Sequence, residues 1–563
     1  MIRQTIRGWM EQAWHAAQQA GELPLAPAIP PFEVEVPRNE QFGDYSTNLA
    51  MVLAKHARRS PREVAQILLR HLPEEANRWV ERVEIAGAGF INFYLKPSWV
   101  GEVVRYILQQ GDHYGESTLG AGKRVLIEFV SANPTGPLTL GHGRNAALGD
   151  TLARLLQTLG YQVEREYYIN DGESSAQIRN FALSVLTRYK QLLGESVEMP
   201  EDAYHGDYVI ELARWIREQY GDHAAEGDPE AVLRQFERWA THQILQEQEC
   251  DLRDFGVQFD RWFSEQSLYE SGVVAQVLQR LREKGYAYES EGALWLRSTA
   301  FGDEKDRVLV RANGMPTYLA SDVAYHLDKY ERGYDLLIDL WGADHHGYVA
   351  RMKAAVAALE HDPDKLVILI YQLVNLYRGG EPVRMSKRAG ELITLREVMD
   401  EIGVDALRFF YLLRSHDSPL DIDLELAKEQ SEKNPVFYVQ YAHARICSIE
   451  RVASEQGVPM PTLEETDLSL LTHPEEIALV KQLAEFPEEV RIAGLQYAPH
   501  RLTSYALDVA RAFHGFYTEC RVLSDDPALT KARLLLIRAT RTVLRNTLAL
   551  MGVSAPERME PRE

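Results

Sequence analysis

Residues 124–144 read RVLIEFVSANPTGPLTLGHGR, and this stretch decides the fold. Its first seven residues, 124–130, form a mostly apolar run that suits a buried strand of a parallel sheet. Residues 131–137 combine Asn, Pro and Gly, which favour a turn. From residue 141 to residue 159 the apolar side chains recur at helical spacing. Strand, turn and helix in this order predict the opening of a Rossmann-like α/β unit.

The rest of the chain predicts a multidomain α/β protein, since 563 residues exceed one ordinary core. Apolar runs at 336–341 and 366–370 would complete the parallel sheet. Segments 32–36 and 90–95 alternate with period two within a small α+β unit. We therefore expect an N-terminal α+β domain over 1–110, a Rossmann-like domain over 111–400 with an insertion at about 170–300, and an all-α domain over 401–563.

Composition narrows the class of protein. Hydrophobic residues make up 45% and charged residues 26%, as in globular proteins. Three cysteines without CxxC spacing disfavour a disulfide scaffold and a zinc site. Neither a signal peptide nor an apolar run of membrane-spanning length stands out, which favours the cytoplasm. The net charge of −22 opposes nucleic-acid binding, so any such surface must be local.

Two glycine-flanked motifs suit phosphate chemistry. In 141–144, GHGR, a helix begins where a strand ends, so backbone N–H groups and the helix dipole can face a phosphate, and His142 could donate to it. In 384–388, RMSKR, clustered cations in a flexible loop suit the clamping of a pyrophosphate. Taken singly, the first is as easily a plain glycine turn and the second a solvated basic loop.

Together, about 240 residues apart, the motifs resemble the two signatures of class I aminoacyl-tRNA synthetases. Further stretches narrow the resemblance to the arginyl family and spread it over essentially the whole chain: 43–48 GDYSTN, 167–171 YYIND, 341–347 WGADHHG, 405–408 DALR and 438–445 YVQYAHAR. One position departs from the family pattern. Thr139 stands where the first signature normally begins with His, and it can hydrogen-bond a phosphate but carries no charge.

The resemblance implies a set of site residues. The catalytic residues would be Thr139, His142 and Lys387, and the ATP site would comprise Gly141, His142, Gly342, Asp344, Met385, Ser386 and Lys387. A guanidinium needs carboxylates, and Glu128 and Asp322 are candidates that we expect at strand ends. On residue type alone, Asp322 could equally be a helix cap and Glu128 an ordinary strand residue. The resemblance adds Asn133, Tyr318 and His345 to the arginine site. The His345-His346 pair has no third ligand at useful spacing, so no metal site is predicted.

A basic helix face is the expected tRNA surface. Residues 531–550 have helical periodicity, and Lys531, Arg538, Arg541 and Arg545 share one face of that helix. From spacing alone this could equally be a solvated cationic face. The helical C-terminal part resembles the family's anticodon-binding domain, in which Tyr441 could stack on an unpaired base.

The activity implied by the resemblance is that of an arginine–tRNA ligase. L-arginine would react with ATP, entering as its Mg²⁺ complex, and then be transferred to tRNA(Arg), without a tightly bound cofactor. A monomer is the default expectation. Two alternatives stay open: a class I synthetase for another amino acid, in which Glu128 and Asp322 would be structural, and a non-catalytic RNA-binding paralogue, which Thr139 makes conceivable.

Overall fold

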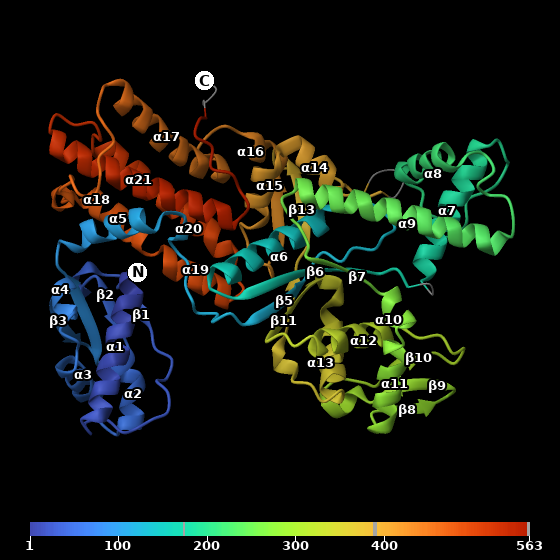
Figure 1. The fold of residues 1–563 in the computed structure, drawn as a ribbon, viewed down its shortest axis with the longest axis horizontal. Coiled ribbons are helices and arrows are strands. Elements are labelled where there is room, and N and C mark those ends of the chain that lie inside the picture. Colours follow the sequence, from blue (N-terminus) through green and yellow to red (C-terminus); the bar gives the residue numbers. More distant parts are fainter. Residues whose placement is uncertain (173–174, 387–390, 560–563) are drawn as a thin grey trace.

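A five-stranded parallel sheet lies at the centre of the computed structural model, which describes residues 1–172, 175–386 and 391–559 (Figure 1). Its strands are β5 Arg124–Glu128, β6 Gln162–Ile169, β7 Arg261–Ser264, β11 Leu336–Gly342 and β12 Leu366–Tyr371, in the order β12-β11-β5-β6-β7. Numbered along the chain, this is the doubly wound order 5-4-1-2-3. The order reverses between β5 and β11, and a ligand crevice is expected there, at the carboxyl ends of the strands.

The chain leaves β5 through a constrained turn. Val130 and Ser131 have φ angles of 65° and 44°, in the left-handed region that a β-branched residue rarely adopts. The Val130 N–H donates to Asn145 Oδ1 at 2.9 Å, and the Ser131 hydroxyl accepts from the Tyr168 N–H at 3.1 Å. These bonds hold the turn so that the following residues cross the carboxyl end of the sheet.

Helix α6, Leu140–Thr158, packs closely against its neighbours and confirms the helix predicted from residue 141. A Cβ added at Gly149 would lie 2.3 Å from the Phe129 ring, and one at Gly143 would lie 2.5 Å from the Tyr411 hydroxyl. Both glycines are therefore required by packing, and the second brings the start of α6 against α15, Val404–Tyr411.

The N-terminal domain is a four-stranded antiparallel sheet, in the order β1-β2-β4-β3, covered by helices. Its elements are α1 Ile2–Gln19, β1 Val34–Glu35, β2 Tyr45–Thr47, α2 Leu49–Ala57, α3 Pro61–Arg70, α4 Ala76–Trp79, β3 Val80–Ala86 and β4 Phe90–Leu95. Helix α5, Trp99–Gln110, follows and packs against α18 and α21 of the C-terminal bundle.

Two units are inserted between strands of the parallel sheet. Helices α7 Ala176–Leu192, α8 Asp207–Tyr220 and α9 Pro229–Asp254 surround a separate apolar core and project to one side (Figure 1). A small antiparallel sheet and several helices follow: α10 Gln266–Glu270, α11 Val273–Glu283, β8 Ala287–Ser290, β9 Ala293–Leu296, β10 Arg307–Val310, α12 Tyr318–Glu331 and, after β11, α13 Val349–Ala358.

Beyond β12 the chain is mainly helical. A three-stranded sheet comes first, and three helices lie between or after its strands. In chain order these elements are β13 Val374–Arg378, β14 Glu381–Pro382, α14 Leu395–Ile402, α15, β15 Leu420–Asp423 and α16 Leu424–Lys428. The bundle contains α17 Pro435–Glu455, α18 Pro474–Ala484, α19 Phe486–Leu495, α20 His500–Glu519 and α21 Pro527–Leu550. Short 3-10 turns occur at Glu40–Phe42, Gly111–His113, Ser298–Phe301, Ala343–Tyr348, Pro363–Lys365 and Leu468–Leu470. The predicted helix at 531–550 and the multidomain α/β fold class are confirmed. Within the described ranges, no helix has the length and apolarity needed to cross a membrane.

Arg408 joins the central sheet region to the C-terminal bundle. Its fully buried guanidinium contacts Asp150 Oδ2 of α6 at 2.6 Å and donates through Nε to the Met551 carbonyl at 2.7 Å. A third bond, at 3.2 Å, reaches the Phe255 carbonyl beyond α9. One side chain thus connects three segments that are distant in sequence.

We expect Arg408→Met to destabilise the protein by about 3 kcal/mol or more, because it leaves Asp150 buried with part of its compensation removed. The shift of the urea-unfolding midpoint measures this. Arg511→Met is the control, since it breaks the exposed pair with Asp508 and should cost under about 1 kcal/mol. Equal shifts in the two variants would contradict the structural role of Arg408.

Candidate active site

A cavity of about 550 Å³ lies at the carboxyl ends of β5 and β11, where the strand order reverses. Its lining brings together residues that the sequence analysis selected from distant segments: Glu128, Asn133, His142, Tyr318, Asp322, Gly342, Asp344 and His345. The polar groups come from two strand ends, the start of α6, helix α12 and the 3-10 turn 343–348. This is the position at which doubly wound sheets bind ligands.

His142 faces the cavity as a neutral donor. The Thr139 N–H donates to its Nδ1 at 3.0 Å, so the ring hydrogen belongs on Nε2. Burial lowers the pKa of His142 to about 4, which keeps the ring neutral near pH 7. The Thr139 hydroxyl lies 3.1 Å from the same Nδ1. Thr139 therefore orients the imidazole through both groups, while a Cβ at Gly141 would meet only the Thr139 hydroxyl, at 3.9 Å, which leaves space for a ligand.

The second glycine-flanked motif is tied to the first through the backbone. Ile393 N–H donates to the Met385 carbonyl at 3.0 Å, and Ser386 forms a bridge with Leu392. Two residues further on, Leu395 N–H donates to the Leu138 carbonyl at 2.9 Å. The chain after the second motif is thus bonded to the residues just before the first. Lys387 lies outside the described residues.

Glu128 lies in the cavity wall with its charge paired. Its Oε1 is 2.7 Å from Lys329 Nζ, which also lies 2.7 Å from Asp339 Oδ1, and its Oε2 accepts from the Ser131 hydroxyl at 2.8 Å. Glu128 ends a strand, as expected. Burial alone would lower the pKa of Lys329, but the charges of Asp339 and Glu128 raise it above its ordinary value.

Asp322 occupies a different local structure from the one predicted. It lies in the second turn of helix α12, and the expectation of a strand end was wrong, because the residues that follow continue with helical periodicity along a buried face. Burial, with a contribution from the charge of Glu128, raises its pKa to about 6 against the opposing effects of His326 and Tyr348. The Tyr348 hydroxyl donates to Asp322 Oδ2 at 3.0 Å. In the part of the chain that the structure describes, no lysine or arginine pairs with this carboxylate.

The remaining predicted residues surround the cavity entrance. Tyr318 begins α12 with 47% exposure. The Asn133 side chain accepts from Asn170 and donates to Gln177, both at 3.0 Å. Asp344 Oδ1 lies 3.2 Å from His345 Nδ1, and both side chains are exposed. In the described ranges no group of three His, Cys, Asp or Glu residues could hold a metal ion.

Sequence reasoning missed several polar residues of this region, among them Asn145, Tyr168, His326, Lys329 and Tyr348. A signal existed for Lys329. Asp322, His326 and Lys329 stand at i, i+4 and i+7, so they mark a polar stripe on the buried face of an amphipathic helix. Such a stripe indicates a site or a buried ion-pair network.

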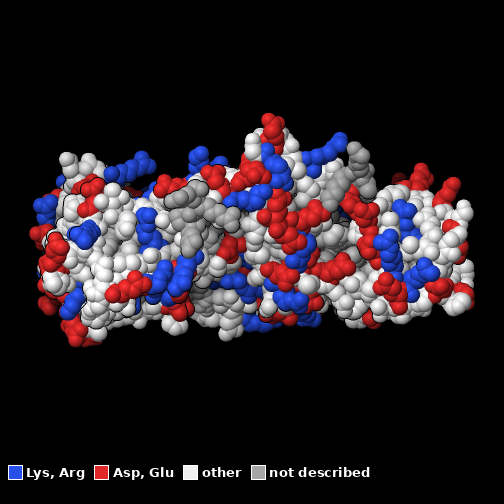
Figure 2. All heavy atoms as spheres, turned by 90° about the horizontal axis from the view of Figure 1, so that it is seen from above, with Lys and Arg blue, Asp and Glu red and all other residues white. Residues whose placement is uncertain are grey.

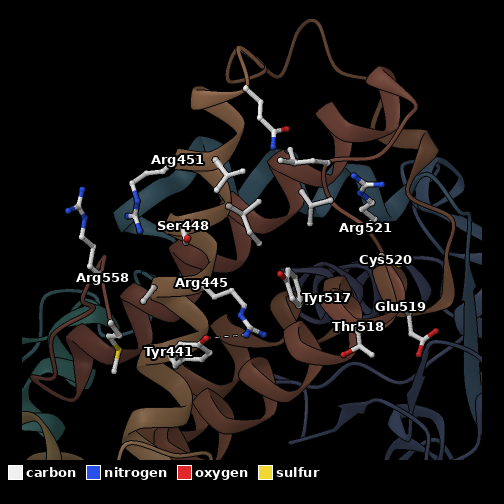
Figure 3. A pocket seen from close by; sticks show the side chains of 17 residues that line it. Tyr441, Arg445, Ser448, Arg451, Tyr517, Thr518, Glu519, Cys520, Arg521 and Arg558 are labelled. Carbon is white, nitrogen blue, oxygen red and sulfur yellow. Dashed lines mark hydrogen bonds between the residues drawn. The ribbon is translucent and has the colours of Figure 1, made fainter. Parts of the chain in front are cut away.

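A second cavity, of about 900 Å³, lies in the helical bundle between α17, the end of α20 and the C-terminal segment (Figure 3). Among the described residues, four arginines line it, Arg445, Arg451, Arg521 and Arg558, against one carboxylate, that of Glu519. The Arg445 guanidinium lies over the Tyr441 ring at 4.9 Å and the Tyr517 ring at 4.7 Å. Aromatic faces and cations thus meet in one hollow.

The basic surface differs from the expected helix face. All four predicted cations on α21 are partly buried, and three are paired: Arg538 and Arg541 with Glu450, and Arg545 with Asp112. Three of the four cations on this face of α21 are thus paired within the protein, and a tRNA role for all four stays a prediction. On the face shown in Figure 2, Lys and Arg side chains are interspersed with Asp and Glu side chains.

Known proteins match the chain from end to end. Family models match the arginyl tRNA synthetase N terminal domain over residues 4–95, the class I (R) tRNA synthetase catalytic domain over 103–410 and the DALR anticodon binding domain over 439–559. An arginine–tRNA ligase of Heliobacterium modesticaldum is 50% identical over 562 residues, 99% of each chain. That of Carboxydothermus hydrogenoformans is 52% identical over 547 residues, 97% of each.

The chain belongs to the arginyl-tRNA synthetase family. The fold is also that of solved arginyl-tRNA synthetases. The Thermus thermophilus structure has a TM-score of 0.75 at 24% identity, covering 99% of this chain and 100% of that one. The Plasmodium falciparum structure has a TM-score of 0.72 at 18% identity, covering 99% of both. The resemblance on sequence motifs is thereby confirmed.

Asp322 is expected to make this synthetase less stable above pH 6. A carboxylate whose folded pKa is raised lowers stability as the pH rises from its unfolded pKa through its folded pKa. Asp322→Asn should therefore unfold later than the parent at pH 8, by up to about 3 kcal/mol, with the difference narrowing between pH 6 and pH 4. Urea unfolding of both proteins across this range measures the effect. A difference independent of pH would contradict it.

Proposed function

We propose that this synthetase is an arginine–tRNA ligase that activates L-arginine with ATP and transfers it to the 3'-terminal adenosine of tRNA(Arg). The observation that carries the proposal is the Asp322 carboxylate, which lies unpaired by Lys or Arg in the described structure, in the same cavity as His142. A guanidinium is the side chain that best compensates such a charge, since it is planar, always cationic and rich in donors.

Arginine would bind with its guanidinium toward Asp322 and Glu128, and Tyr318 and Asn133 would close the pocket around it. His345, which also lines the cavity, would lie near the α-amino or carboxylate end. One oxygen of the arginine carboxylate attacks the α-phosphorus of ATP, the bond to the bridging oxygen breaks, and pyrophosphate leaves. The terminal ribose hydroxyl of the tRNA then attacks the adenylate carbonyl, loses its proton, and AMP leaves.

Catalysis in this scheme is positioning and charge stabilisation, without a covalent enzyme intermediate. Neutral His142 donates through Nε2 to a phosphate, Gly141 admits it closely, and Gly342 and Asp344 receive the adenosine. Met385, Ser386 and Lys387 would clamp the pyrophosphate. Mg²⁺ enters with ATP as part of the substrate complex.

The arginine-lined cavity is the proposed place for unpaired bases of the tRNA. Cations attract the phosphates, and the Tyr441 and Tyr517 rings offer stacking faces. A local basic hollow also reconciles RNA binding with a net charge of −22. We further propose that the enzyme works in the cytoplasm as a monomer.

Charging of bulk tRNA with labelled amino acids, with and without ATP, tests the function. ATP-dependent charging with arginine, and with no other amino acid, supports the proposed function. Charging with another amino acid would favour the alternative class I specificity. Binding of tRNA without ATP consumption would favour the non-catalytic paralogue.

We expect Asp322→Asn to lower kcat/KM for arginine by roughly 30-fold or more, because a desolvated guanidinium loses its charged partner, at about 2 to 5 kcal/mol. The Michaelis constant for ATP and the affinity for tRNA should change less than about twofold. Steady-state aminoacylation with each substrate varied in turn measures the three quantities. Parallel losses for all three would remove the specificity argument.

Arg445→Leu should weaken tRNA binding about tenfold and flatten the salt dependence of log K by roughly 0.7 to 0.9, the loss of one phosphate contact. Turnover at saturating tRNA should be unchanged. Filter binding over a range of salt concentrations gives both values. The matched control is Arg511→Leu, a pair-forming surface arginine of α20 outside the cavity lining, and it should bind like the parent.

A further inference from the structure

A buried tyrosine hydroxyl without a partner lines the proposed arginine pocket. Tyr168 of β6 is 7% exposed and borders the same cavity as Asp322 and Glu128. No group in the described ranges hydrogen-bonds its hydroxyl. An unpaired buried hydroxyl lowers stability, so its presence at a ligand site indicates that the ligand completes its bonding.

The surroundings fix where this hydroxyl lies. The Tyr168 ring stacks on the Tyr325 ring, with centroids 4.3 Å apart and planes 21° apart, and on Phe263 at 6.2 Å. Its backbone N–H is held by Ser131. The ring cannot turn away without breaking this stack, so the hydroxyl is held in one buried position on a residue that lines the cavity.

The hydroxyl is neutral and lies in a negative field. Burial, with the nearby charges of Glu265, Asp322 and Glu128, raises the pKa of Tyr168 well above its ordinary value. It therefore keeps one O–H donor and two acceptor lone pairs at neutral pH. No described group occupies these lone pairs, so they are available to a donor.

The carboxylate oxygens of the pocket already accept hydrogen bonds from other groups of the protein. Both Glu128 oxygens are bonded within the protein, by Lys329 and by Ser131, and Asp322 Oδ2 accepts from Tyr348. A guanidinium brings five N–H donors to this pocket. These five donors need more acceptors than the two partly occupied carboxylates offer, so a further neutral acceptor is required.

We propose that Tyr168 is a specificity-determining residue, whose hydroxyl oxygen accepts an N–H of the arginine guanidinium. This inference rests on the proposed function. It assigns Tyr168 a contact with the substrate and predicts opposite signs for stability and activity, because the hydroxyl is unsatisfied only in the absence of arginine.

The test is Tyr168→Phe, which keeps the ring stack and removes only the hydroxyl. Without ligand, its Tm should equal or exceed that of the parent. The KM for arginine should rise about tenfold, the value expected for one hydrogen bond, while the KM for ATP stays within twofold. The Tm increase produced by saturating arginine should shrink.

Agmatine, which keeps the guanidinium and lacks the carboxylate, locates the effect. Its inhibition constant against arginine should rise by the same factor as the KM for arginine. The matched control is Tyr330→Phe, which removes a tyrosine hydroxyl of the same helix α12 that donates to the Asp362 carbonyl and lies outside the lining of this cavity. It should leave the KM for arginine within twofold.

An unchanged KM for arginine in Tyr168→Phe overturns the inference, as does an inhibition constant for agmatine that stays constant while the KM rises. A lower Tm with parallel losses for arginine and ATP also overturns it, since that result means a structural role. Asp322→Asn distinguishes failure of the Tyr168 inference from failure of the proposal on which it rests. If it impairs arginine use and Tyr168→Phe does not, only the role of Tyr168 fails; if neither impairs it, the proposed placing of arginine in this cavity fails too, and failure of the parent to charge tRNA with arginine would overturn the proposed function.

Discussion

The carboxyl end of the parallel sheet depends on the ion pairs of Lys329 with Glu128 and Asp339. Glu128 and Asp339 are paired neighbours in the register of the parallel strands β5 and β11, both buried, and their charges would repel without a cation between them. Lys329, with no exposed surface, lies 2.7 Å from each. Its ammonium compensates both carboxylates at the point where the strand order reverses. It leaves Asp322, about two helical turns earlier on α12, as the carboxylate of the cavity lining that no described Lys or Arg pairs with. The internal charge pairing thus determines which negative charge is available to a substrate.

The motif 141–144 shows how four adjacent residues serve four purposes. Gly141 leaves room for a ligand, and His142 offers a neutral donor whose tautomer is fixed by Thr139. Gly143 permits contact with Tyr411, while the buried Arg144 donates to the carbonyls of Gln372, Ser415 and Ser418 at 2.8 to 2.9 Å. His142, the proposed donor to phosphate, is therefore built on a rigid junction between the sheet and the following domain, as precise positioning requires.

Much of the fold could be predicted from the sequence because it follows from local patterns. The run 124–130, the turn after it and the helix from 141 each satisfy one period or turn rule, and so do the runs that become β11 and β12. The site was harder. Asp322 was misplaced at a strand end although its neighbours form a helical stripe, since short apolar segments fit both periods. The cations of α21 were identified correctly as one face of a helix, but their partners Glu450 and Asp112 lie far away in sequence, and no local pattern shows such pairs. The basic cavity likewise combines α17, the end of α20 and the C-terminal segment, which only the tertiary fold brings together.

The pocket's discrimination follows from what it leaves unsatisfied. A neutral or shorter side chain in this cavity would leave the Asp322 carboxylate without a cation and the Tyr168 hydroxyl without a partner. A site that rejects analogues through unpaired buried polar groups reaches discrimination of roughly 10⁴- to 10⁵-fold, whereas an apolar pocket that must exclude one methylene group reaches only about 10- to 200-fold. Unsatisfied buried groups also lower the stability of a free protein, so the proposed specificity and its stability cost have one physical origin. A pocket of this kind has no physical need for a second, hydrolytic site to correct its errors, because the correct substrate alone completes the charge balance that Lys329 leaves open.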